Sequence, residues 1–204
     1  DDMVSRVKAE LQRQGRLSNT VFVFTSDNGM AWGEHRWLTK TVPYSTQLPL
    51  YIAWPAGRGT NPKTDSTLLS NIDLASTFCE LGGCVMGPYK DGQQKADGVS
   101  FAHILKNKTV SWTRDASLEE MPPYNATSVA PADANSRRPY WYAVRTGANN
   151  PLGLWHYIEV GTGEKELYDI SKGPCFRWSA SKGGDPCELK NLLGPGTNPS
   201  QQIK

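Results

Sequence analysis

Several side chains that could take part in chemistry follow one short apolar run near the start of the chain. The run is 21–24, and it leads directly into Asp27, Asn28 and Gly29. A carboxylate oxygen and a neutral amide oxygen side by side are ligands that suit a hard cation such as Ca²⁺ or Mg²⁺. Gly29 allows the backbone to turn there without a Cβ clash. Asp-Asn-Gly is also a common turn sequence, so a turn without a metal is the alternative.

An α/β sheet would place these side chains at its functional edge. Residues 2–14 have helical periodicity and end at Gly15, and the apolar run 21–24 lacks alternation, which predicts a strand covered on both faces. A second buried strand is predicted at 48–54. In open α/β sheets ligands bind outside the carboxyl ends of the strands, and residues 25–29 would lie there. The strand that should precede this helix would have to lie before Asp1.

Two short helices are predicted farther along. Asp73 can cap a helix whose Leu74, Phe78 and Leu81 share one side, and Ser100 can cap a second. Residues 140–146, 155–160 and 166–168 have the character of strands and predict an antiparallel meander. The predicted organisation is an α/β core (1–110), a loop or linker (111–139), an antiparallel C-terminal subdomain (140–193) and a flexible tail (194–204).

Composition excludes several classes of protein. The chain has 204 residues, 38% of them hydrophobic, and 22 basic against 20 acidic side chains give a net charge of +2. No Lys/Arg run indicates a nucleic-acid or membrane-surface partner. The apolar stretches are too short to span a bilayer. The chain starts at Asp1 without methionine or a visible signal peptide, so we expect a processed product or a piece of a longer protein.

The four cysteines form two local pairs, Cys79 with Cys84 and Cys175 with Cys187. Neither spacing is that of a zinc ribbon, so two disulfides are predicted, with free buried thiols as the alternative. Sequons at Asn107 and Asn125 are compatible with the same environment. Together these features favour a secreted, periplasmic or lumenal/lysosomal protein.

The candidate metal-binding and substrate-binding residues also occur in a pattern known from a protein family. The chain resembles the sulfatases, the formylglycine-dependent enzymes of the alkaline-phosphatase-like superfamily, and most closely their C-terminal portion. The motifs occur in the family's order along most of the chain: 25–29 (TSDNG), 33–35 (GEH), 40–44 (KTVPY), 48–50 (LPL), 70–75 (SNIDLA), 97–100 (DGVS), 166–169 (ELYD) and 185–192 (DPCELKNL).

The resemblance implies roles for individual residues. Asp27 and Asn28 match the motif whose side chains complete a divalent-metal site, for Ca²⁺ or Mg²⁺. Lys40 matches the lysine that contacts the sulfate, where an ammonium offsets negative charge as the ester bond breaks. His35 would either donate to the sulfate or to substrate hydroxyls, or support its loop. His103 and His156 match no family motif and are interpreted as structural or surface residues.

Two departures from the family pattern matter. Ser45 follows Pro-Tyr where the family usually has an acidic residue. The family's nucleophile is a formylglycine made from Cys or Ser in a Cys/Ser-x-Pro-x-Arg motif, and none of the 204 residues begins that motif. We therefore expect the formylglycine and the other metal ligands in a missing N-terminal half, which would be a partner of this chain. The chain alone should be inactive.

The resulting hypothesis is that the chain is part of a metal-dependent sulfatase that hydrolyses sulfate esters. Sulfated sugars such as glucosamine 6-sulfate are the favoured substrates. A phosphate or phosphonate monoesterase of the same superfamily is one alternative. A non-catalytic, carbohydrate-binding remnant is the other, although it would have little reason to retain Asp27, Asn28 and Lys40.

Overall fold

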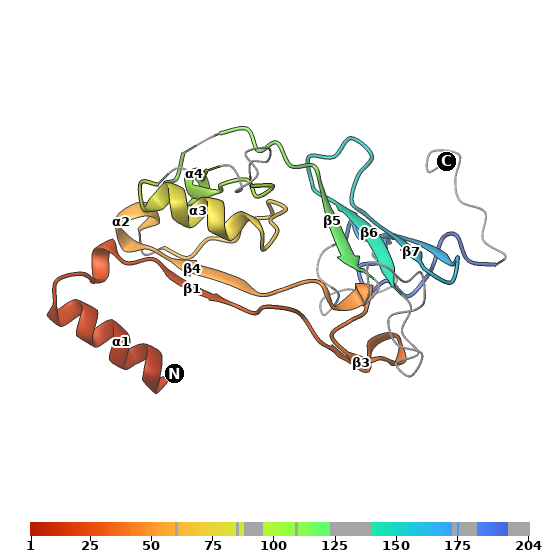
Figure 1. The fold of residues 1–204 in the computed structure, drawn as a ribbon, viewed down its shortest axis with the longest axis horizontal. Coiled ribbons are helices and arrows are strands. Elements are labelled where there is room, and N and C mark those ends of the chain that lie inside the picture. The colour runs from red at the N-terminus through yellow and green to blue at the C-terminus, as the bar shows by residue number, and fades with distance from the viewer. Residues whose placement is uncertain are drawn as a thin grey trace. The chain divides into compact units, whose positions relative to one another are not determined.

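The computed structural model describes residues 1–59, 61–84, 86–87, 96–108, 110–122, 140–172, 175 and 183–195. The chain forms two compact units. Unit 1 comprises Asp1–Asp27, Leu48–Asp65 and Leu69–Trp112, and unit 2 comprises Asn28–Gln47, Ser66–Leu68 and Thr113–Lys204. The α-helices lie in unit 1, whereas antiparallel strands occur in both units (Figure 1).

The first helix of unit 1 is the one that the sequence periodicity predicts. α1 (Asp2–Arg13) buries none of its residues, and Val4 and Val7 on its apolar side are 50% and 49% exposed. A 3₁₀ helix, η1 (Leu17–Asn19), connects α1 to the first strand. The apolar side of α1 is thus uncovered by the described residues.

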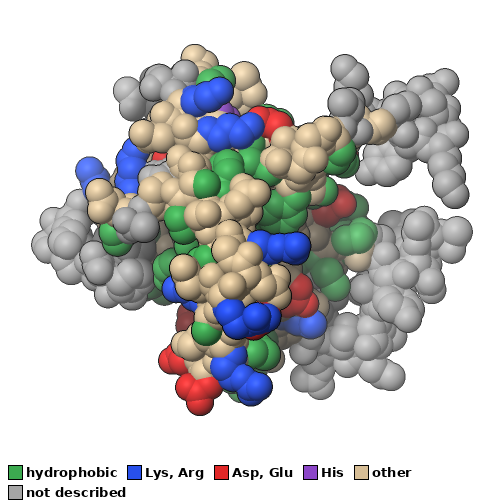
Figure 2. All heavy atoms as spheres, turned by 90° about the vertical axis from the view of Figure 1, so that its left-hand side faces the viewer, with side chains coloured by type: hydrophobic (Ala, Val, Ile, Leu, Met, Phe, Trp, Pro, Cys, Tyr) green, Lys and Arg blue, Asp and Glu red, His purple; other side chains and the backbone are tan. Residues whose placement is uncertain are grey.

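The predicted strands near residues 21 and 48 are both present, but they pair differently from the expectation. β1 (Phe22–Thr25) and β4 (Leu50–Ala53) form a two-stranded antiparallel sheet. We expected β1 to be covered on both faces, and this was wrong for the described residues: Phe24 and its cross-strand partner Tyr51 are 65% and 69% exposed. A two-stranded ladder has too few neighbours to bury both faces. Hydrophobic side chains reach the surface on the face seen in Figure 2.

Beyond α1, the described part of unit 1 contains three more α-helices, and buried polar side chains of the middle one hold a neighbouring segment. These helices are α2 (Pro55–Arg58), α3 (Asp73–Leu81) and α4 (Ala102–Leu105). Asp73 is fully buried and is the first helical residue instead of the cap; its carboxylate accepts from the backbone N–H groups of Ser70 and Val99, each over 2.8 Å. Phe78, predicted on the packed side, is 43% exposed. Asp73 therefore joins the 97–100 segment to α3.

Unit 2 contains the predicted meander and one strand more. Its sheet has the antiparallel order β5-β6-β7-β8, formed by β5 (Ala116–Met121), β6 (Trp141–Thr146), β7 (Trp155–Val160) and β8 (Lys165–Asp169). Trp141, Ala143, Ile158 and Tyr168 form its buried core. A small hairpin of β2 (Ala31–Trp32) and β3 (Leu38–Thr39) and the 3₁₀ helices η2 (Glu34–Arg36) and η3 (Pro43–Ser45) complete the unit.

β5 corrects the prediction that 111–139 is only a loop. Its six residues pair with all of β6 and form an outer strand of the sheet. The inward side of β5 carries Ser117 and Glu119, and polar residues on an inward face do not produce the apolar alternation that identifies a strand. The remaining residues of that prediction, 123–139, lie outside the described residues.

A C-terminal segment covers the free edge of β8. The Asn191 side chain accepts from the Leu167 N–H over 3.1 Å and donates to the Lys165 carbonyl over 3.0 Å. Leu192 adds a backbone bond to Leu167 of 2.9 Å. This contact explains the 185–192 motif as an anchor, since an uncovered strand edge has unpaired backbone groups.

Both predicted disulfides are present, Cys79–Cys84 and Cys175–Cys187. No helix among the described residues is long and apolar enough to cross a membrane. The sequon at Asn125, Thr109 of the other sequon and residues 196–204 of the predicted flexible tail lie outside the described residues.

Candidate functional site

The turn after β1 presents the two predicted metal ligands at consecutive positions. Asp27, at the end of unit 1, is exposed, and its Oδ1 accepts a hydrogen bond from Ser26 Oγ over 3.3 Å. Asn28 begins unit 2 and is half-buried; its Nδ2 donates to the Gly29 carbonyl over 2.9 Å. Because this bond uses Nδ2, it fixes the orientation of the Asn28 amide group and therefore the direction in which Oδ1 points.

Gly29 is required for a close approach between two of the family motifs. A Cβ on Gly29 would lie 2.0 Å from the Ser45 carbonyl oxygen, which is backbone and cannot rotate away. Only glycine therefore allows the turn at 28–29 to pack directly against η3. Ser45 itself is buried, and its hydroxyl donates to the Val42 carbonyl over 2.8 Å. The acidic residue that the family usually has at position 45 would therefore be buried in this structure.

Lys40 lies just beyond β3, on a backbone that is anchored on both sides. Its neighbour Thr39 is buried, whereas Lys40 is exposed and has no ion pair with any described residue. On the other side, Trp141 Nε1 of β6 donates to the Thr41 carbonyl over 3.0 Å. The segment thus presents a cation to solvent from a fixed backbone, which is the arrangement that recognition of an anion needs.

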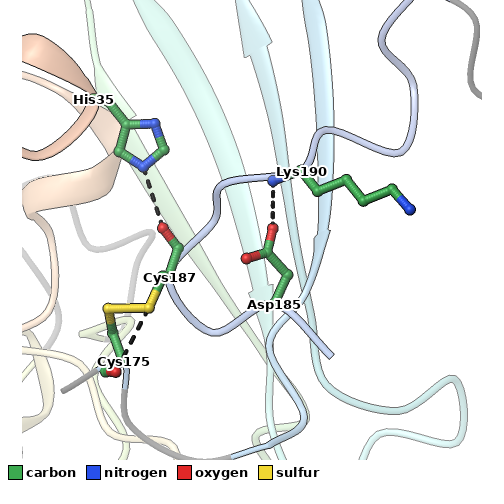
Figure 3. Close-up of a disulfide and its surroundings, with 5 residues drawn as sticks. All are labelled: His35, Cys175, Asp185, Cys187 and Lys190. Carbon is green, nitrogen blue, oxygen red and sulfur yellow. Dashed lines mark hydrogen bonds between the residues drawn. A yellow bond between two sulfur atoms is a disulfide. The ribbon is translucent and has the colours of Figure 1, made fainter. Parts of the chain in front are cut away.

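His35 occupies an unusual backbone conformation at the tip of the β2–β3 hairpin. His35 and Arg36 both have positive φ, 52° and 64°, which costs a non-glycine residue about 1–3 kcal/mol. The His35 ring stacks on Tyr44 with a centroid distance of 3.7 Å and an interplanar angle of 7°. Its Nε2 lies 3.3 Å from the Cys187 carbonyl, which can only accept, so Nε2 carries the proton (Figure 3).

These residues offer part of a metal shell. Carboxylate and amide oxygens from Asp27 and Asn28 are the donor types that Ca²⁺ and Mg²⁺ take. No group of three or more His, Cys, Asp or Glu side chains within the described residues could hold a metal by itself. The donor chemistry therefore fits a divalent cation that takes further ligands from elsewhere.

Sequence reasoning missed a buried ionic cluster in unit 2, formed by Glu119, Arg145, His156 and Glu188. His156 is fully buried; its Nδ1 lies 2.8 Å from Glu188, and its Nε2 lies 3.4 Å from Glu119. Arg145 contacts the same two carboxylates, at 3.0 Å from Glu119 and 3.1 Å from Glu188. The only sequence signal was the presence of Arg145 and His156 on two of the predicted strands, without any indication that they meet each other or the two glutamates.

The cluster shifts the pKa values of its members. Burial alone would raise the pKa of Glu119, but the nearby His156 and the charge of Arg145 lower it to about 2. Burial would likewise raise the pKa of Glu188, but His156 and Arg145 lower it. Burial and the Arg145 charge oppose protonation of His156, yet Glu119 and Glu188 outweigh them and raise its pKa. With His156 protonated, the two carboxylates are balanced by two cations.

The thermal stability of the protein should therefore fall at both acidic and alkaline pH. The raised pKa of His156 stabilises the folded state below its ordinary value of 6.5, and this contribution is lost as the pH rises through the folded-state value. The lowered pKa of Glu119 stabilises above its ordinary 4.5, and this is lost as the pH falls towards about 2. We expect the melting temperature, measured between pH 3 and 9, to be highest between these limits.

The matched test of this profile uses the two histidines. His156→Gln should remove most of the decline on the alkaline side, whereas His103→Gln, a change at a half-buried histidine of unit 1, should leave the profile unchanged. An alkaline decline of equal size in His156→Gln would assign it to another group. Besides the cluster, Tyr168 is the titratable residue opposite His156 in the β7–β8 register, and its pKa is raised, first by burial and then by Glu166, to a value far above this range.

Comparison with known proteins connects these observations. Residues 1–84 match the model of the family described as Sulfatase. An N-acetylglucosamine-6-O-sulfatase of Bacteroides thetaiotaomicron is 28% identical over 198 residues, covering 95% of this chain and 30% of that protein. An N-acetylglucosamine-6-sulfatase of Bos taurus is 31% identical over 124 residues, covering 58% of this chain and 21% of that protein. The chain thus spans a third or less of these relatives.

Solved structures give the fold. A 2-O GAG sulfatase superposes with a TM-score of 0.67 and 22% identity, over 95% of this chain and 36% of that chain. A phosphonate monoester hydrolase of Agrobacterium radiobacter superposes with a TM-score of 0.64 and 21% identity, over 94% of this chain and 34% of that chain. The predicted fold class, the end of an alkaline-phosphatase-like α/β domain followed by an antiparallel C-terminal sheet, is confirmed.

Proposed function

The chain is related to the sulfatases of the alkaline-phosphatase-like superfamily, and on that premise we propose that its residues form one wall of a sulfate-ester hydrolase site. Asp27 and Asn28 contribute oxygen ligands to a divalent cation, Ca²⁺ or Mg²⁺. Lys40 faces the sulfate group. The observation that carries the proposal is that the segment matching the family, 1–84, contains all three residues.

The structure supports a role for Lys40 in the reaction. Hydrolysis of a sulfate ester moves negative charge onto the sulfate and the leaving oxygen, and a fixed ammonium beside these atoms lowers the barrier. Lys40 is exposed, has no carboxylate partner among the described residues, and lies between the buried Thr39 and the anchored Thr41. Little reorganisation would be needed for its charge to meet the substrate.

The remaining groups are implied by the family. When bound, the cation and the formylglycine would supply charge stabilisation of the sulfate oxygens and the nucleophile, respectively. The formylglycine motif is absent from the 204 residues, so the nucleophile and the other metal ligands would come from polypeptide outside this sequence. These 204 residues should accordingly hydrolyse no sulfate ester by themselves.

We propose a sulfated amino sugar as the substrate class. Two relatives named as N-acetylglucosamine 6-sulfatases align with this chain, one of them over 95% of its length. The likeness to phosphonate monoester hydrolases is one of fold alone, at 21% and 20% identity. Two disulfides, found also in many exported proteins, support a secreted, periplasmic or lumenal location.

The test compares Asp27→Ala with Asp2→Ala, an exposed aspartate of the same unit, in the full-length protein with its formylglycine. We expect wild type to hydrolyse 4-nitrophenyl sulfate and N-acetylglucosamine 6-sulfate faster than phenylphosphonate esters. Asp27→Ala should weaken Ca²⁺ or Mg²⁺ binding, measured by calorimetry, by at least the roughly 10–100-fold seen when a metal site's supporting groups are removed. Asp2→Ala should bind the cation as wild type does.

Three results would contradict the proposal. Unchanged cation affinity in Asp27→Ala would exclude Asp27 as a ligand. Preferential hydrolysis of the phosphonate ester would favour the monoesterase alternative, and hydrolysis of none of these compounds would favour a non-catalytic role.

A further inference from the structure

The His35 side chain lies within a set of contacts that link the hairpin to the C-terminal sheet. Its ring stacks on Tyr44, and both of these rings make edge contacts with Tyr168 of β8, at centroid distances of 6.5 Å from His35 and 6.4 Å from Tyr44. Its Nε2 donates to the backbone carbonyl of Cys187. All of these groups belong to unit 2. The ring is thus occupied on a face, at an edge and at one nitrogen by protein atoms.

The partners of His35 are themselves held in place. The hydroxyls of Tyr44 and Tyr168 both donate to Oε2 of Glu166, over 2.6 Å and 2.9 Å. Burial and the Glu166 carboxylate raise the pKa of both tyrosines, so both hydroxyls remain protonated donors at neutral pH. Cys187 is joined to Cys175 by a disulfide (Figure 3). A carboxylate that accepts two such bonds fixes the orientation of both rings.

The same hairpin lies between the two ends of the candidate site. Asn28 precedes β2 and Lys40 follows β3, and Ala31 pairs with Thr39 across the hairpin. A shift of the hairpin tip would therefore move the backbone that carries Lys40. The strained conformation at His35 and Arg36 indicates that the contacts of His35 impose this geometry, because neither residue adopts it without support.

We propose that His35 is a positioning residue, which acts on sulfate-ester hydrolysis by holding the Lys40 segment against the C-terminal sheet through Tyr44, Glu166 and Cys187. The inference rests on the proposed function of Lys40. It resolves the two roles left open for His35: its ring supports the loop, and substrate contact is not required. The function of the Pro-Tyr corner follows as well, since Tyr44 connects the hairpin to Glu166 of the 166–169 motif.

The test uses His35→Asn and Tyr44→Leu in the full-length protein with its formylglycine. Asparagine tolerates positive φ, so His35→Asn removes the ring without forcing a new backbone. Each variant should lower kcat for 4-nitrophenyl sulfate by about 10–100-fold, the scale of a misplaced catalytic group, and the double variant should be no worse than either one. His103→Asn, at a histidine that contacts Trp112 in unit 1, is the matched control and should keep wild-type kcat.

Combination with Lys40→Ala separates positioning from a general loss of structure. If His35 acts through Lys40, His35→Asn should lower kcat by less than about 2-fold in a Lys40→Ala background. An equal loss in both backgrounds would overturn the proposal. So would a wild-type kcat in Tyr44→Leu together with a low kcat in His35→Asn, because that pattern is expected of direct substrate contact by His35.

Two variants keep the test decisive if His35→Asn does not fold. Tyr44→Phe and Glu166→Gln retain every ring and weaken only the bonds to Glu166. A reduced kcat with an unchanged KM in both supports the inference, and wild-type kcat in both overturns it. Failure of wild type to hydrolyse any sulfate ester would instead contradict the proposed function itself.

Discussion

Lys40→Ala should lower kcat for a sulfate ester by about 10²–10³ in the full-length protein, which is the effect of removing one group that stabilises transition-state charge. The melting temperature should stay within a degree or so of wild type, since an exposed lysine without an ion pair contributes little to stability. Initial rates at saturating 4-nitrophenyl sulfate and a thermal melt measure the two quantities. The expected pattern is a loss of turnover without a loss of folding.

Two companion variants define what the Lys40 result means. Lys63→Ala, at another exposed lysine, should leave kcat unchanged. Lys40→Arg should recover only part of the rate, because a planar guanidinium does not place its charge where a compact ammonium does. Near-normal turnover in Lys40→Ala at an unchanged melting temperature would show that Lys40 is a solvated surface residue.

Arg145→Met should lower the free energy of unfolding by about 3–5 kcal/mol, measured by urea denaturation at pH 7. Glu119 and Glu188 are only 14% and 9% exposed, and Arg145 is the cation that both of them contact besides His156. The variant leaves two buried carboxylates with one histidine between them. Removing one member of a buried ionic set is costly for this reason, even where the complete set contributes little to net stability.

Arg13→Met provides the comparison for a surface pair. Arg13 contacts Glu10 at 2.6 Å, but their side chains are 73% and 50% exposed, so water screens the pair. Its loss should leave the free energy of unfolding almost unchanged. Equal destabilisation by the two substitutions would mean that the cluster around Arg145 is as well hydrated as the pair on α1.

Short-range structure could be predicted from the sequence. The helix at 2–13 follows from apolar periodicity and a terminal glycine, and β6, β7 and β8 follow from runs of strand-forming residues separated by turns. Both disulfides join cysteines that are near in sequence, with separations of 5 and 12 residues. The predicted site residues also come from one stretch, 27–40, and their roles remain predictions that rest on the resemblance to the sulfatases. In all these cases the partners are close along the chain.

Contacts between distant segments required the tertiary structure. His35 meets the Cys187 carbonyl across 152 residues, and Arg145 meets Glu188 across 43. A polar residue on a strand has the same pattern in the sequence whether it faces water or a buried counter-charge. The sequence therefore predicts a loop over β5 and, although it favours a structural or surface role for His156, does not place that residue between two carboxylates. Asp73 likewise carries the signature of a helix cap, but its carboxylate also binds the Val99 N–H, 26 residues away. Periodicity reports which face of an element is apolar; which distant group meets its polar side chains depends on how the chain folds back on itself.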